Sequence, residues 1–98
     1  MRTVRYHPEA RAEFLDQVAH YIAISARLAA RFDSAVTDAE TLAAESPETW
    51  PKHKYRTRRV IDRVFKFSLV YLYNESEVFV VAVAPMRRRP EYWRTRLR

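Results

Sequence analysis

The stretch Val64-Phe-Lys-Phe-Ser-Leu-Val-Tyr-Leu-Tyr-Asn-Glu-Ser-Glu-Val-Phe-Val-Val-Ala-Val-Ala84 decides the fold. Its first half predicts a strand from Val64 to Tyr73, because apolar side chains recur at every second position: Phe65, Phe67, Leu69, Tyr71 and Tyr73. The polar run Asn74-Glu-Ser76 predicts a turn. The second half, Glu77 to Ala84, is almost entirely apolar, as expected of a central strand that is covered on one or both faces. We therefore expect a sheet with this hairpin at its centre.

The neighbouring segments extend this sheet. Arg58 to Arg63 is short and basic, and we expect it to be a strand that precedes the hairpin. Ser46 to Tyr55 is polar and contains two prolines, which predicts a loop. Arg2 to Tyr6 predicts a short first strand. Pro85 ends the last strand, and Pro90 to Arg98 is expected to form either a short helical turn or an extended arm.

Two amphipathic helices are predicted between the first strand and the loop. Pro8 suits the first helical position, where its missing N–H needs no partner. Apolar side chains then recur at helical spacing in two stripes: Phe14, Val18, Tyr21 and Ile22, followed by Leu28, Phe32, Val36, Ala39, Leu42 and Ala43. One long helix would bring the stripes out of phase, so we place a break near Ser25, a possible N-cap. The second helix should end at Glu45 or Ser46, because Pro47 disfavours helix at the residue before it.

The order of these elements, βααβββ, predicts an α+β fold. We expect an antiparallel sheet packed against an N-terminal helical hairpin, in a single domain over residues 1–98. A chain of this length supports one hydrophobic core.

Composition excludes several classes of protein. The sequence contains no cysteine, so disulfides and thiolate chemistry are excluded and a reducing cytoplasm is the expected location. It also contains no glycine, which Walker loops and dinucleotide fingerprints need so that a phosphate can approach the backbone. Nucleotide cofactors bound in these ways are therefore excluded. We expect no other cofactor and no metal. No apolar run is long enough to span a membrane.

Charge is divided unevenly along the chain. Residues 1–49 hold 5 Lys or Arg against 8 Asp or Glu, whereas residues 50–98 hold 13 against 4. The segment from Pro85 to Arg98 alone carries six arginines together with Tyr92 and Trp93. Guanidinium groups bind phosphate or carboxylate bidentately and also stack on aromatic rings. The second half therefore predicts an acidic or nucleic-acid partner, although a solvated surface and a Trp93 that folds back on the core remain alternatives.

Short motifs along nearly the whole chain carry a resemblance. In order, they are Tyr6-His-Pro-Glu-Ala10, Arg31-Phe32, Ser46-Pro-Glu-Thr-Trp-Pro51, Arg58-Arg59, Arg63-Val-Phe-Lys-Phe-Ser-Leu-Val-Tyr71 and Ala82-Val-Ala-Pro-Met-Arg-Arg-Arg-Pro-Glu-Tyr-Trp93. In this order and spacing, the chain resembles the ParE/RelE superfamily of toxins from type II toxin–antitoxin systems, which includes plasmid stabilisation proteins. One departure concerns chemistry: Pro85 stands where many relatives have a histidine, so an imidazole acid or base is missing there.

The resemblance implies a growth-inhibiting toxin that a cognate antitoxin neutralises. One branch of relatives cleaves mRNA on the ribosome, and the other poisons DNA gyrase. For gyrase binding, arginine and aromatic side chains are the usual interface anchors. We expect them here at Arg58, Arg59, Arg63, Arg87, Arg88, Arg89, Tyr92 and Trp93.

An RNA-cleaving site would instead need a base for the 2′-OH and cations for the phosphorane charge. Its candidates are Arg59, Arg88, Tyr92 and His53, although a lone loop histidine is more often plain surface. Because the imidazole is missing at Pro85, we favour the gyrase poison and keep the ribosome-dependent endoribonuclease as the alternative. A DNA-binding regulator or an inactive interaction module is a weaker reading, since no helix-turn-helix pattern is present. Contact with operator DNA is expected only through the antitoxin.

Overall fold

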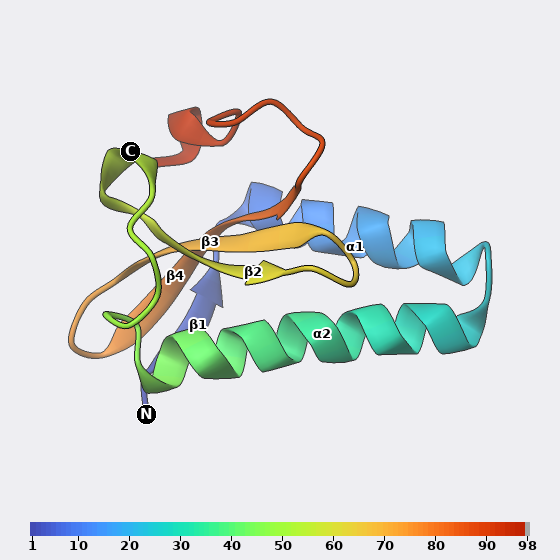
Figure 1. The fold of residues 1–98 in the computed structure, drawn as a ribbon, viewed down its shortest axis with the longest axis horizontal. Coiled ribbons are helices and arrows are strands. Elements are labelled where there is room, and N and C mark those ends of the chain that lie inside the picture. Colours follow the sequence, from blue (N-terminus) through green and yellow to red (C-terminus); the bar gives the residue numbers. More distant parts are fainter. Residues whose placement is uncertain (98) are drawn as a thin grey trace.

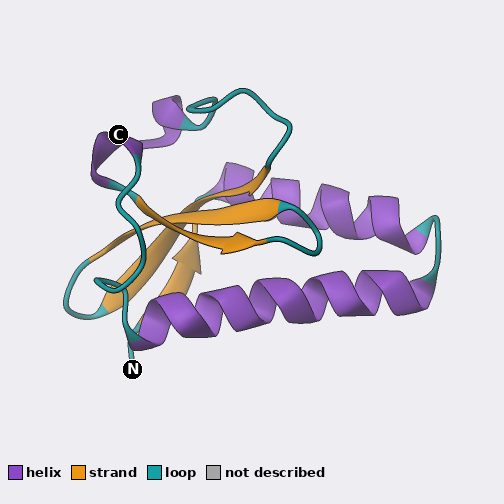
Figure 2. Cartoon of the chain, in the orientation of Figure 1, coloured by secondary structure: helices purple, strands orange, loops and turns teal. Residues whose placement is uncertain are grey.

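A computed structural model of the chain describes residues 1–97. The elements in chain order are β1 (Thr3–Tyr6), α1 (Pro8–Ile22), α2 (Ala26–Glu45), β2 (Arg58–Asp62), β3 (Phe67–Tyr73) and β4 (Glu77–Pro85), with short 3₁₀ turns at Lys54–Arg56 and Arg94–Leu97. The two helices lie side by side along one face of the sheet, and the C-terminal segment crosses the other face (Figures 1 and 2). The predicted α+β order βααβββ is confirmed.

The helical hairpin is built from local signals in the sequence. His7 caps α1, since its Nδ1 accepts a hydrogen bond from the backbone N–H of Glu9 at 3.0 Å, and Pro8 occupies the first turn. Ser25 caps α2 with its Oγ, which accepts from the N–H of Leu28 at 2.9 Å, so the predicted break is confirmed. Within residues 1–97, neither helix is long and apolar enough to cross a bilayer.

The sheet has the strand order β1-β4-β3-β2 and is mixed. The β2–β3–β4 meander is antiparallel, as predicted, but β1 pairs in parallel with β4, from Thr3 opposite Glu77 to Tyr6 opposite Val80. The expectation of a wholly antiparallel sheet is therefore wrong for this pair. The reason is the chain path: α1 continues in the direction of β1, and the helical hairpin and the meander then bring β4 back to that direction (Figure 1).

The two strands of the hairpin are shorter than predicted. Strand β2 ends at Asp62 and not at Arg63, and β3 begins at Phe67 and not at Val64. Residues 63–66 form a turn, so Arg63 is not in a strand and Val64 is 73% exposed. Asp62 accounts for this turn, because its Oδ2 accepts the backbone N–H of Phe65 at 2.7 Å. Lys66 then adopts a left-handed backbone with φ 58°. The alternation of apolar residues in the sequence continues through this turn, but the hydrogen bond from the Phe65 backbone to Asp62 interrupts the strand.

The main core lies between the helices and the sheet. Phe32 of α2 packs edge-on against Phe67 of β3, and both are fully buried. Tyr71 is also buried, and its hydroxyl donates to the carbonyl of Pro47 at 2.6 Å, which ties the loop after α2 to the sheet. Burial of a large apolar side chain of this kind contributes about 1.5–3 kcal/mol. This core fixes the helical hairpin on one face of the sheet.

A second, smaller cluster covers the opposite face of the sheet. Here Val70, Val81 and Ala82 pack against Trp93, which is 2% exposed. The expectation of one core is therefore incomplete, since the C-terminal segment closes a second one. Of the two arrangements expected for this segment, the short helical turn is confirmed and the extended arm is not: the segment ends in the 3₁₀ turn Arg94–Leu97 and packs on the sheet (Figure 1).

Candidate functional site between the sheet and the C-terminal tail

A cavity of about 430 Å³ opens between the outer face of the sheet and residues 86–97, which we call the tail. The segment before β2 contributes His53 and Lys54, β2 contributes Arg59, and the tail contributes Arg88 and Arg89. None of the described residues that line it is acidic. This basic cavity therefore concentrates positive charge without a carboxylate on its own walls.

Arg59 is the least exposed cation of the basic cavity. Its backbone N–H donates to the carbonyl of Pro51 at 3.3 Å, which anchors the start of β2 to the preceding loop. Its side-chain Nε is buried and has no hydrogen-bond partner within the described part of the chain. An unpaired buried donor costs about 1–3 kcal/mol, so an acceptor placed in the cavity would relieve this cost.

His53 lies against the indole of Trp93, with ring centroids 5.8 Å apart. Burial lowers the pKa of His53, and the nearby charges of Arg59 and Lys54 lower it further. The imidazole is therefore neutral at physiological pH and would gain a proton more readily if an anion entered the cavity.

Glu13 of α1 holds the tail in place. Its side chain is 12% exposed and binds both terminal nitrogens of Arg96, at 3.0 and 3.1 Å, and the backbone N–H of Val83 at 3.1 Å. Arg96 is 8% exposed and also donates to the carbonyl of Val81 at 3.1 Å. Sequence reasoning missed this pair, because Glu13 occupied an ordinary polar position of the helix pattern and its partner lies 83 residues away.

Tyr92 is engaged by the same carboxylate. Its hydroxyl donates to Glu13, and its pKa is raised first by burial and then by this hydrogen bond. The guanidinium of Arg88 lies 3.8 Å from the centre of the Tyr92 ring and 3.9 Å from Glu13. Tyr92 therefore stays protonated and directed into the protein, whereas the Arg88 side chain is half exposed.

The remaining predicted site residues lie in different places. Arg58 is partly buried and donates to the carbonyl of Trp50 at 2.7 Å, which makes it a structural contact of the loop. Arg63 is exposed on the turn between β2 and β3, away from the residues that line the basic cavity. Arg87 is exposed and lines a different hollow. Trp93 is buried, so the prediction that it contacts a target directly is not supported, and its place is to hold the tail on the sheet.

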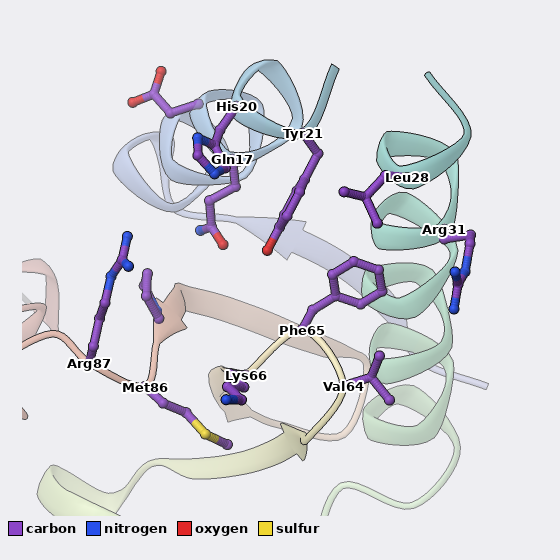
Figure 3. Close-up of a pocket in the computed structure, with 12 residues that line it drawn as sticks. Gln17, His20, Tyr21, Leu28, Arg31, Val64, Phe65, Lys66, Met86 and Arg87 are labelled. Atoms are coloured by element: carbon purple, nitrogen blue, oxygen red, sulfur yellow. The ribbon is translucent and has the colours of Figure 1, made fainter. Parts of the chain in front are cut away.

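The hollow that includes Arg87 is larger and lies between the helices and the end of the sheet. Its volume is about 880 Å³, and Phe65 lies in it between Tyr21 of α1 and Leu28 of α2 (Figure 3). Arg87 lies beside Met86 on the side of the hollow opposite Leu28 (Figure 3). This groove is mainly apolar, and only Arg87 among the predicted tail cations belongs to it. Among residues 1–97, no three His, Asp or Glu side chains come together in a way that could hold a metal ion.

Residues 4–90 match the model of the ParE toxin of type II toxin–antitoxin systems, parDE. The chain belongs to this family. A search of curated proteins gave no match.

Membership of the ParE family makes this chain the toxin of a type II system and implies an antitoxin as its partner. The match covers the helical hairpin, all of the sheet except Thr3 at the start of β1, and the first residues of the tail. Tyr92, Trp93 and Arg96 lie beyond it.

Proposed function

We propose that this ParE-family toxin is a single domain that inhibits DNA gyrase by binding, with Arg59, Arg88 and Arg89 as its principal contacts. The observation that supports this most directly is the basic cavity, which combines several cations with no acidic wall. Arginines at the centre of an interface are typical anchors of binding energy. Gyrase works on chromosomal DNA, so the toxin would act in the cytoplasm.

The same geometry makes RNA cleavage a weaker reading. A nuclease needs a group that can accept or deliver a proton at the reacting phosphate. Tyr92 is bonded to Glu13 and has a raised pKa, so its hydroxyl is poorly suited to either step. The lowered pKa of His53 makes it a weak general base, and its ring packs against Trp93. Binding needs none of this chemistry.

A double substitution tests the proposal. Arg88→Ala with Arg89→Ala should weaken inhibition of gyrase supercoiling by roughly 10- to 100-fold, because each anchor arginine contributes about 1 kcal/mol or more. The measurement is the toxin concentration that halves supercoiling of relaxed plasmid, together with accumulation of cleaved DNA complexes.

The matched control removes two exposed arginines from α2. Arg27→Ala with Arg31→Ala changes the net charge by the same amount on the helical face of the molecule, and inhibition should change by less than about twofold. Equal losses in both variants would show that only net charge matters. If gyrase is unaffected while programmed ribosomes give mRNA cuts, the gyrase proposal is wrong and the endoribonuclease reading replaces it.

A further inference from the structure

The carboxylate of Glu13 has no free acceptor position. A carboxylate offers about four lone-pair positions to hydrogen-bond donors. Its Oε1 accepts from Arg96 at 3.0 Å and from the backbone N–H of Val83 at 3.1 Å. Its Oε2 accepts from the second terminal nitrogen of Arg96 at 3.1 Å and from the hydroxyl of Tyr92. All the acceptor positions are therefore occupied, one of them by Tyr92.

Arg88 lies next to this saturated carboxylate without a hydrogen bond to it. Its Nη1 is 3.9 Å from Oε2 of Glu13, which is beyond hydrogen-bond distance. Among residues 1–97, Glu13 is nevertheless the only acidic side chain within ion-pair distance of Arg88. The guanidinium instead lies 3.8 Å from the centre of the Tyr92 ring, and the side chain is 51% exposed. A guanidinium stacked on a ring in this way keeps its N–H groups available to an anionic partner.

Two arrangements of Arg88 are therefore close in space, one stacked on the ring and exposed, the other drawn onto Glu13. Without the hydroxyl of Tyr92, Oε2 of Glu13 would have a vacant acceptor position on a side chain that is only 12% exposed. A vacant acceptor in a poorly solvated place is unfavourable, and a hydrogen bond between two charged groups is the stronger kind. A shift of Arg88 by about 1 Å would supply that bond. The hydroxyl is thus the group that keeps Arg88 off the carboxylate.

We propose that Tyr92 is a positioning residue, whose hydroxyl occupies Glu13 so that Arg88 stays stacked on the Tyr92 ring and available to the target. Tyr92 thereby contributes to inhibition through Arg88, without contact between its own hydroxyl and the target. A phenylalanine would offer the same ring for stacking but would leave the carboxylate open to Arg88. The inference rests on the proposed function in one respect, which is that Arg88 contacts gyrase. The position of Arg88 is measurable without gyrase.

The chain contains a matched control for this arrangement. On the helical side of the sheet, the hydroxyl of Tyr6 donates to Glu40, and the guanidinium carbon of Arg11 lies 4.2 Å from the centre of the Tyr6 ring. Burial, followed by this hydrogen bond, raises the pKa of Tyr6, as the corresponding contacts do for Tyr92. None of these three residues lines the basic cavity. Tyr6→Phe therefore removes the same kind of bond away from the proposed contacts.

The first test measures where Arg88 lies. In ¹⁵N-labelled toxin at mildly acidic pH, NMR follows the exchange of the Arg88 side-chain N–H protons with water. This exchange should be roughly tenfold slower in Tyr92→Phe than in the parent, because a charge-assisted hydrogen bond to Glu13 must then open first. Tyr6→Phe should leave the rate unchanged. An unchanged rate in Tyr92→Phe, or equal changes in both variants, would overturn the proposal.

The second test measures inhibition of gyrase supercoiling. Tyr92→Phe should weaken inhibition by about fivefold, the loss expected from removal of one anchor arginine, whereas Tyr6→Phe should change it by less than about twofold. In a toxin that already carries Arg88→Ala, Tyr92→Phe should have no further effect, because Tyr92 acts through Arg88. If the hydroxyl only stabilised the tail, the second substitution would weaken inhibition further, since Arg89 would be displaced as well.

The outcomes of the two tests are distinguishable. If Tyr92→Phe inhibits as well as the parent, or if it weakens the Arg88→Ala toxin further, Tyr92 does not act through Arg88 and the proposal is wrong. If the parent toxin leaves gyrase unaffected, the proposed target is wrong, and the exchange rates of Arg88 alone decide the role of Tyr92. Urea unfolding should give similar midpoints for Tyr92→Phe and Tyr6→Phe, so that a difference in inhibition between them does not arise from stability.

Discussion

At the scale of single residues, Glu13 has the largest structural influence on the candidate site. One carboxylate binds Arg96 with two hydrogen bonds, the backbone of Val83 and the hydroxyl of Tyr92. These contacts join α1, β4 and the tail at one point. Because both charged partners are largely buried, removal of one leaves the other without compensation in a poorly solvated place.

Glu13→Gln should therefore destabilise the fold by about 3 kcal/mol, since it removes the charge while it preserves the shape of the side chain. The measurement is the midpoint of urea unfolding. Glu9→Gln on the same helix is the control: Glu9 also faces Arg96, at 3.9 Å, but is 67% exposed, so its loss should cost less than about 1 kcal/mol. Similar shifts for the two variants would contradict the role assigned to Glu13.

At the scale of elements, the tail covers the outer face of the sheet. The last strand is apolar on both faces, and the helices cover only one of them. Trp93 is the largest buried side chain in the cluster that covers the other face, next to Val81 and Ala82. The same packing positions Arg88 and Arg89 at the rim of the basic cavity, so the order of the tail and the shape of the site depend on one another.

Trp93→Ala should cost about 3 kcal/mol, because it empties the centre of this cluster. Trp93→Phe should recover roughly half of the loss, since it restores part of the apolar volume. Urea unfolding of both variants measures this, and binding of a hydrophobic dye to the alanine variant should reveal the uncovered sheet. A Trp93→Ala variant as stable as the parent would mean that the tail does not cover the sheet in solution.

How much of this was accessible from the sequence depends on the range of each interaction. The strand alternation before Tyr73, the cap at Ser25 and the stop at Pro47 act within a few residues, and the elements that they predict are present. The hydrogen bond that forms the turn at Asp62 is also local, but the alternation of apolar residues continues through the turn, so the sequence did not predict it. The site was harder to predict from the sequence. The cations of the basic cavity were predicted as site residues, but the cavity itself forms only where β2 and the tail meet.

At the scale of the whole molecule, the tail and the sheet should unfold together. We propose that residues 1–97 form one cooperative unit, because the contacts of Glu13 and Trp93 link the tail to both α1 and the sheet. A small single domain with such links unfolds in one step.

A fluorescence measurement checks this. The chain has two tryptophans, so Trp50→Phe leaves Trp93 as the only reporter, and it reports on the tail. Its thermal transition should coincide with the loss of helix measured by circular dichroism. If the fluorescence transition comes at a clearly lower temperature, the tail unfolds by itself and is not part of the unit.

The sequence by itself determined the elements, their order, the basic character of the second half and the resemblance to ParE toxins, since periodicity, caps and composition are properties of neighbouring residues. Only the tertiary structure decided that β1 lies parallel to β4, that Trp93 is covered, and that the buried Nε of Arg59 has no partner among residues 1–97. Each of these depends on residues that are distant in the chain and adjacent only in the fold. No local pattern encodes such neighbours, because they are selected by the packing of the whole molecule.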